Sequence, residues 1–192
     1  LAHIQPESPT QTQKKALLSA KVDLAQKRPK TALKRLASIH HVEQLPVYEQ
    51  AQFHEALAHS YQVLNKPLES ITERIKLDQI LPDEGSRENN RRALWLALTT
   101  LPSPELNTLA VEGEPGSILR GWTELALIAR NNPAYPQKML AKLSTWENTY
   151  PKHPARALLP QSLEAMQGHL YEKPKQIALL LPLSGPLAGP GH

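Results

Sequence analysis

Residues 47–82, VYEQAQFHEALAHSYQVLNKPLESITERIKLDQILP, decide the fold of this chain. Asn65-Lys66-Pro67 separates two helical patterns, and a proline in this place ends one helix and suits the first turn of the next. In both patterns the large apolar residues recur every three or four positions, which places them on one helix face. They are Phe53, Leu57, Tyr61 and Leu64 in the first pattern, and Leu68, Ile71 and Ile75 in the second. The segment therefore predicts two antiparallel helices joined by a tight turn.

The same segment fits the tetratricopeptide (TPR) pattern of large, small and aromatic residues followed by small, apolar and proline residues. The matching residues are Leu57, Ala58, Tyr61, Ser70, Leu77 and Pro82. A small residue such as Ala58 lets two helices approach closely, and Pro82 ends the second helix so that another pair can stack. The preceding pair offers Ala20, Ala32, Leu36 and Ile39, and Ala20 lies 38 residues before Ala58. Later pairs match less well, so the array is TPR-like.

The 18 prolines cut the rest of the chain into helix-sized pieces. We expect helices over residues 11–27, 88–100, 103–111 and 117–131. We also expect one helix that begins at residue 29 and another around 139–150. A turn is expected at 82–86, and a last helical stretch reaches about 170. Two later helices have clear apolar stripes, namely Ile118, Trp122, Leu125 and Ala129, then Met139, Leu143, Trp146 and Tyr150. The predicted fold class is all-α, an α-solenoid of stacked antiparallel helix pairs that occupies residues 1–171.

The tail has a different pattern. Residues 176–182, QIALLLP, form a short continuous apolar run, which is typical of a parallel strand covered on both faces. No other segment could be its sheet partner. We therefore expect residues 172–192 to hold a linker, then the first strand and loop of a truncated α/β domain.

Composition excludes several function classes. The absence of cysteine rules out disulfides, thiolate nucleophiles and thiolate metal sites. A net charge of +4, without aromatic residues among the basic ones, argues against nucleic acid as a partner. No apolar run approaches the roughly 20 residues that cross a bilayer. No signal peptide begins at Leu1, so we expect that either there was none or it lies outside this chain.

Three groups of residues invite a functional interpretation. His54 and His59 are five positions apart, about 140° around a helix, and so cannot chelate one ion from one face. The three tryptophans, Trp95, Trp122 and Trp146, are better explained as core residues than as a ligand platform. Lys14, Lys21 and Arg28 recur every seven residues and predict a basic stripe, either solvated or in weak contact with an anionic polymer or partner. We find no catalytic, cofactor-binding or metal-binding residues, so the sequence predicts a protein that is not an enzyme.

Four segments, taken in order, resemble the LpoA-type lipoproteins. They are Lys76-Leu77-Asp78, Leu119-Arg120-Gly121-Trp122, the run STWENTYPKHP at residues 144–154, and the tail QIALLLPLSGPLA at residues 176–188. The tail is similar to the first strand and loop of type I periplasmic-binding-protein domains, which fits the two-domain interpretation above.

The resemblance implies an exported protein, lipidated and attached to the outer membrane on its periplasmic side. Such a protein activates a class A penicillin-binding protein in peptidoglycan synthesis. The resemblance also implies that the partner contact lies chiefly on the domain missing from this chain, and that the present domain is a non-catalytic scaffold or spacer. Two alternatives stay open: the supporting domain of a periplasmic small-ligand sensor, and a general TPR adaptor for peptide tails.

Overall fold

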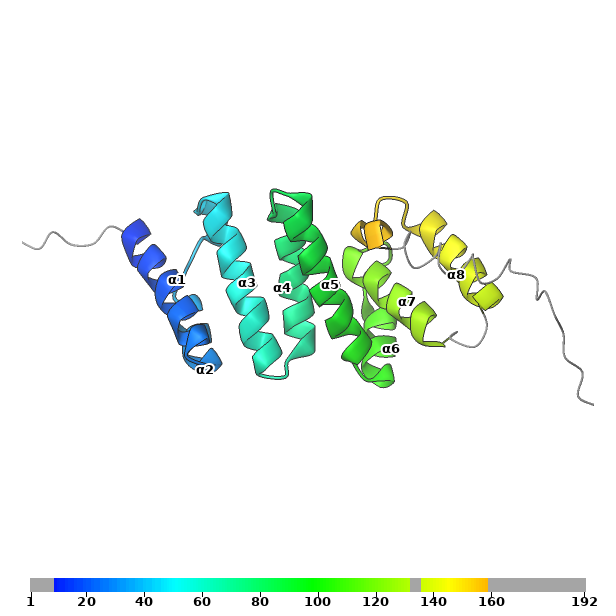
Figure 1. Ribbon diagram of the computed structural model, residues 1–192, viewed down its shortest axis with the longest axis horizontal. Coiled ribbons are helices and arrows are strands. Elements are labelled where there is room, and N and C mark those ends of the chain that lie inside the picture. Colours follow the sequence, from blue (N-terminus) through cyan, green and yellow to red (C-terminus); the bar gives the residue numbers. More distant parts are fainter. Residues whose placement is uncertain (1–8, 132–135, 159–192) are drawn as a thin grey trace, which may run out of the picture.

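The computed structural model describes residues 9–131 and 136–158, and within these ranges it holds eight α-helices and two short 3-10 helices and no strand. The elements are α1 (Pro9–Ala25), α2 (Pro29–Leu36), η1 (Val42–Gln44), α3 (Val47–Val63), α4 (Pro67–Ile80), α5 (Glu84–Thr100), α6 (Ser103–Glu112), α7 (Ile118–Asn131), α8 (Pro136–Thr149) and η2 (Pro154–Leu158). The helices stand side by side along the long axis of the molecule (Figure 1). This arrangement confirms the predicted all-α array. The helical stretch predicted after residue 158, the domain boundary at 171 and the strand at 176–182 lie outside the described residues.

In each of the first two helix pairs, the two helices are joined by the same kind of turn. Lys27 and Asn65, 38 residues apart, both have positive φ angles, of 58° and 54°. In each turn the next backbone N–H reaches back five residues, from Arg28 to the Asp23 carbonyl at 2.8 Å and from Lys66 to the Tyr61 carbonyl at 2.9 Å. This hydrogen bond is typical of a Schellman helix end. A proline, Pro29 or Pro67, then opens the second helix of the pair.

Small residues lie where the paired helices meet. Ala20 and Ala58 are fully buried, as are Ala32 and Ser70 on the following helices. The Ser70 hydroxyl donates a hydrogen bond to the Ala58 carbonyl at 2.9 Å, so α3 and α4 are linked at the point of closest approach. The 38-residue repeat predicted from the sequence is therefore present in the packing.

The predicted faces of α3 and α4 were partly wrong. Leu57 and Tyr61 are half-buried and Leu68 is 41% exposed, whereas Ala51, Ala56 and Ser60 are buried beside Phe53. The reason is that α3 packs against α1 and α2 on one side and against α4 on the other. A helix enclosed on two sides needs small residues as well as an apolar stripe.

Two further predictions need correction. Ala129 is exposed, because the buried face of α7 ends with Leu125 and Ala126. Residues 84–86 belong to α5 and not to the turn before it. The Asp83 carboxylate accepts a hydrogen bond from the Ser86 N–H at 2.8 Å and so caps the helix one turn earlier than expected.

The interior divides into two hydrophobic clusters. One lies around Leu17, Leu36 and Phe53 near the start of the array, and the other lies around Leu98, Trp122 and Trp146 further along. No helix in the described part of the chain is both long enough and apolar enough to cross a membrane.

Candidate functional site

The histidine pair on α3 holds no shared site. The Nδ1 atom of His54 lies 2.6 Å from a carboxylate oxygen of Glu73 on α4, whereas His59 is exposed. Within residues 9–131 and 136–158, no three histidine or acidic side chains are grouped so that they could hold a metal ion. His54 therefore links two helices, and its neighbour His59 does not take part.

The predicted basic stripe is not continuous. Arg28 lies beyond the end of α1, and its guanidinium pairs with Asp23 at 2.6 Å. Asp23 is buried and also binds Arg35 at 2.5 Å, and the hydrogen bond from Arg35 together with both arginine charges lowers its pKa against the effect of burial. Lys14 pairs with Glu49 at 2.9 Å. All three predicted residues are exposed, but within the described part of the chain Lys21 is the one of the three that has no ion pair.

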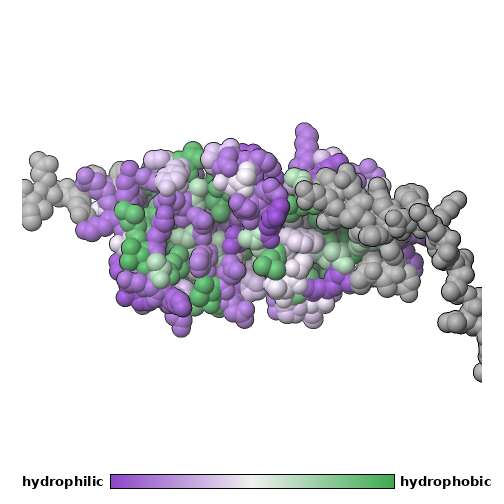
Figure 2. All heavy atoms as spheres, in the orientation of Figure 1, coloured by the Kyte–Doolittle hydropathy of each residue, from purple (hydrophilic) through white to green (hydrophobic). Residues whose placement is uncertain are grey.

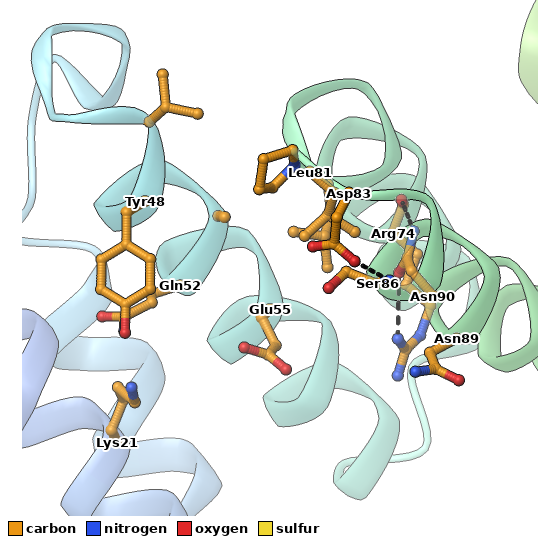
Figure 3. Close-up of a pocket in the computed structure, with 14 residues that line it drawn as sticks. Lys21, Tyr48, Gln52, Glu55, Arg74, Leu81, Asp83, Ser86, Asn89 and Asn90 are labelled. Atoms are coloured by element: carbon orange, nitrogen blue, oxygen red, sulfur yellow. Dashed lines mark hydrogen bonds between the residues drawn. The ribbon is translucent and has the colours of Figure 1, made fainter.

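Lys21 instead belongs to a groove of about 720 Å³ that the sequence did not predict. Figure 3 shows α3 on one side of this groove and α5 on the other, with α4 behind them. The helix α1, which carries Lys21, lies at the lower left. Its apolar lining comes from Val47, Ala51, Leu77, Leu81 and Pro82. Its polar lining includes Lys21, Tyr48, Gln52, Glu55, Arg74 and Asn89.

Several of these polar groups have no internal partner. Within the described ranges, the side chains of Lys21, Tyr48, Gln52, Glu55 and Asn89 take part in none of the hydrogen bonds or ion pairs. Tyr48 is 73% exposed, and its ring points along the groove toward Lys21 (Figure 3). Free donors and acceptors from three helices thus converge on one concave surface.

Arg74 on α4 has an unusual environment in the groove. Its two terminal nitrogens donate to carboxamide oxygens, to Asn90 at 3.4 Å and to Gln62 at 3.0 Å. Its Nε is buried without an acceptor, and no carboxylate of the described residues lies within ion-pair distance. Burial lowers the pKa of Arg74, while the charge of Glu55 acts in the opposite direction. The guanidinium is therefore a half-buried cation without a direct counter-ion.

The α5 wall of the groove is held firmly against α4. The Asn90 amide donates to the Arg74 carbonyl at 2.8 Å. One turn further along α4, Arg91 Nε lies 3.0 Å from both carboxylate oxygens of Asp78, and the guanidinium reaches Glu84 at 2.7 Å. This contact gives a structural reason for the Lys76-Leu77-Asp78 segment noted in the sequence. It fixes α5 against α4.

The other two sequence segments that the structure describes meet each other at a second junction. Trp146 donates its indole N–H to the Gly121 carbonyl at 2.8 Å, and His153 Nε2 lies 2.9 Å from the Ile118 carbonyl. A Cβ atom placed on Gly121 would lie 2.6 Å from the His153 ring, so only glycine fits there. Burial lowers the pKa of His153, and the ring sits among Trp122, Trp146 and Tyr150. This junction is structural, and it confirms Trp122 and Trp146 as core residues.

Trp95 is half-buried and packs against Trp122 at a ring separation of 6.4 Å, which also agrees with a core role. The groove residues were missed because each is an ordinary polar residue on an amphipathic helix. One feature of the sequence could have indicated the groove. Tyr48 is an aromatic residue that lies outside the apolar stripe of its helix, so core packing does not explain its presence.

Comparison with known proteins connects this fold to a family. Residues 1–192 match the family described as "LppC putative lipoprotein". A relative in Edwardsiella piscicida, named penicillin-binding protein activator LpoA, is 32% identical over 178 residues, covering 93% of this chain and 25% of that protein. This chain thus spans about a quarter of the length of such curated relatives.

Solved structures agree with this relationship. The amino-terminal domain of Escherichia coli LpoA aligns with a TM-score of 0.70 and 26% identity, covering 90% of this chain and 73% of that one. The N-terminal domain of LpoA from Haemophilus influenzae aligns with a TM-score of 0.72 over 90% of this chain and 75% of that one, and at 23% identity it supports the fold. These matches confirm the resemblance to LpoA-type lipoproteins and the helical fold expected from it.

Proposed function

We propose a function from the premise that this chain belongs to the LppC family. The chain forms a non-catalytic helical scaffold within an envelope lipoprotein that activates a class A penicillin-binding protein. The observation that carries this proposal is the family match over the whole chain, together with the helical array that the described residues form. Relatives named as activators of penicillin-binding proteins support the assignment.

The proposed role of the array is to act as a spacer. Each helix pair packs mainly on its neighbours, so the array extends along one axis (Figure 1). In the proposed arrangement the whole protein is attached to the outer membrane by a lipid and lies in the periplasm. The spacer sets how far the active part reaches, and tethering acts through reach and effective concentration. The contact with the synthase then lies chiefly on the larger part of the relatives that this chain does not span.

A replacement experiment in cells tests the spacer role. The segment corresponding to residues 9–158 is exchanged, within the whole lipoprotein, for an unrelated helical array of equal length or of half that length. Survival is then measured in a strain that depends on the lipoprotein. The equal-length array should restore growth and the short one should not. Failure of both arrays, with the exchanged proteins folded and exported, would mean that this domain makes a specific contact that length alone cannot replace.

A further inference from the structure

We propose that the end of the array formed by α1 and α2 binds the surface of a membrane that contains anionic phospholipids, with Leu18 and Val22 entering the headgroup layer. This proposal goes beyond the spacer role, because it assigns a partner to a surface of this domain and a direction to the array. It starts from the uneven distribution of charge along the chain. Residues 11–36 hold eight lysines and arginines and one acidic residue, whereas residues 47–112, from α3 to α6, hold six basic and ten acidic residues.

The cations at this end differ in how the fold uses them. Both arginines bind the buried carboxylate of Asp23, Arg28 at 2.6 Å and Arg35 at 2.5 Å. Four lysines, by contrast, are exposed, and their side chains take part in no hydrogen bond or ion pair with the described residues. These four, called the end lysines below, are Lys21 on α1, Lys27 in the following turn, and Lys30 and Lys34 on α2.

Unpaired lysines favour a partner whose negative charges are many and mobile. A lysine ammonium is a point charge on a flexible stem, whereas the fork of an arginine suits a carboxylate or phosphate held in a fixed position. Lysine is also depleted at protein–protein interfaces. Lys30 and Lys34 lie one turn apart on α2, where like charges repel each other until an anionic surface neutralises them. An anionic bilayer, whose headgroups move freely toward the lysines, meets these conditions better than an acidic protein does.

The exposed face of α1 adds an apolar contact. Leu18 and Val22 are 63% and 53% exposed and lie one helical turn apart, with Lys21 next to Leu18 on the helix surface. Figure 2 shows hydrophobic surface over α1, with hydrophilic side chains beside it. Aliphatic side chains flanked by lysines are typical of a helix that lies on a bilayer surface. Residues 11–36 contain no aromatic residue, which argues against the bases of a nucleic acid as the partner, because bases stack on aromatic side chains.

The position of the two helices gives this contact a consequence for the whole array. Within the described part of the chain, α1 and α2 pack chiefly on each other and on α3, and they form one end of the array (Figure 1). Their outer sides are therefore left uncovered by the other described helices. An array that rests on a membrane by this end points its long axis away from the bilayer and carries α8 at its far end.

The experiment measures sedimentation of the whole 192-residue chain, carrying no lipid, with phospholipid vesicles. We expect the chain to bind vesicles of phosphatidylcholine mixed with phosphatidylglycerol and not vesicles of phosphatidylcholine alone, and the binding should weaken as salt is added. A lysine close to an anionic bilayer strengthens binding by about fivefold. The triple variant Lys27→Gln, Lys30→Gln and Lys34→Gln should therefore bind anionic vesicles at least about tenfold more weakly.

Two matched controls separate this contact from a general attraction between opposite charges. The triple variant Lys138→Gln, Lys142→Gln and Lys152→Gln loses the same charge at and beyond α8, and it should bind as the unaltered chain does. Because the chain has no cysteine, a polarity-sensitive dye can be attached at a single site, Val22→Cys or, as the control, the exposed Val111→Cys on α6. Anionic vesicles should shift the emission of the dye at position 22 to the blue and leave the dye at position 111 unchanged.

Four results would overturn the proposal: no binding to anionic vesicles at low salt, equal binding to both kinds of vesicle, an equal effect of the two triple variants, or an unchanged emission of the dye at position 22. Soluble polyglutamate that binds through the end lysines when vesicles do not would also overturn it and would identify an acidic protein as the partner. The measurement needs no synthase and no tether. Its failure would therefore leave the spacer proposal standing, and failure of the spacer experiment would leave this one standing.

Discussion

Replacing Gly121 with alanine is the sharpest test of the packing described for the second half of the array. Gly121 is buried in α7, and a Cβ atom there would lie 2.6 Å from two atoms of the His153 ring and 3.1 Å from the Tyr150 ring. The His153 ring has little freedom to move away. Its Nε2 lies 2.9 Å from the Ile118 carbonyl, and its Nδ1 accepts from the Ala155 N–H at 3.1 Å.

The size of the effect follows from two opposing contributions. Alanine in place of glycine inside a helix stabilises by about 1 kcal/mol when nothing obstructs it. Overpacking a filled core costs about 1–3 kcal/mol, and breaking the His153 hydrogen bond costs about 1 kcal/mol more. We therefore expect Gly121→Ala to lower the free energy of unfolding by about 2 kcal/mol. The assay is urea unfolding followed by circular dichroism, with two-state behaviour checked by tryptophan fluorescence.

Gly85 provides the matched control. It also lies in a helix, but a Cβ atom there would meet nothing closer than the Asp83 carboxylate at 3.4 Å, which is an ordinary contact. Gly85→Ala should therefore be neutral or slightly stabilising. The reasoning would be refuted if Gly121→Ala were as stable as Gly85→Ala. A double variant with His153→Ala should recover part of the loss, because the obstructing ring is then gone.

Two other predictions concern stability. Burial lowers the pKa of His153 in the folded chain, so the stabilisation that comes from its neutral ring is complete above the unfolded pKa of about 6.5 and is lost as the pH falls below that value. Urea unfolding between pH 7 and pH 5 should show a falling free energy of unfolding. An imidazole that titrates in the folded state at its usual pKa would contradict this prediction. Ala58→Leu should cost about 1–3 kcal/mol, because Ala58 is fully buried where α3 meets α4. The variant His59→Leu, at the adjacent exposed position, should change the free energy of unfolding by no more than about 0.5 kcal/mol. Equal melting temperatures for the two variants would contradict the repeat alignment, which places Ala58 at a helix crossing.

The sequence predicted the repeat because the repeat depends on local rules. A proline that opens a helix and small residues at a crossing are visible in the chain itself, and Pro67 and Ala58 behave as those rules require. Helix faces were less predictable. Leu68 shares a predicted helix face with Ile71, yet Leu68 is 41% exposed while Ile71 is buried, since the spacing does not reveal which side of a helix its neighbours cover.

The candidate site could not be predicted, because it depends on which polar residues stay unpaired after folding. Lys14 and Lys21 look equivalent in the sequence, yet Lys14 is paired with Glu49 and Lys21 is left on the groove. Asp23 is the one acidic residue among the many basic ones at positions 14–35 of the sequence. The structure places it in the interior, where it is the shared partner of Arg28 and Arg35. Such pairings join residues on different helices, and only the packing decides them.

The most direct test of the scaffold proposal is the rate of glycan polymerisation by a purified class A penicillin-binding protein. The synthase is assayed alone, with this 192-residue chain, and with the longer lipoprotein that the proposal places it in. A spacer is inert in solution when nothing is tethered, so the chain alone should leave the rate at its basal value while the complete protein raises it. Equal stimulation by the chain and by the complete protein would show that the helical array is itself the activator, and the spacer role would then be wrong.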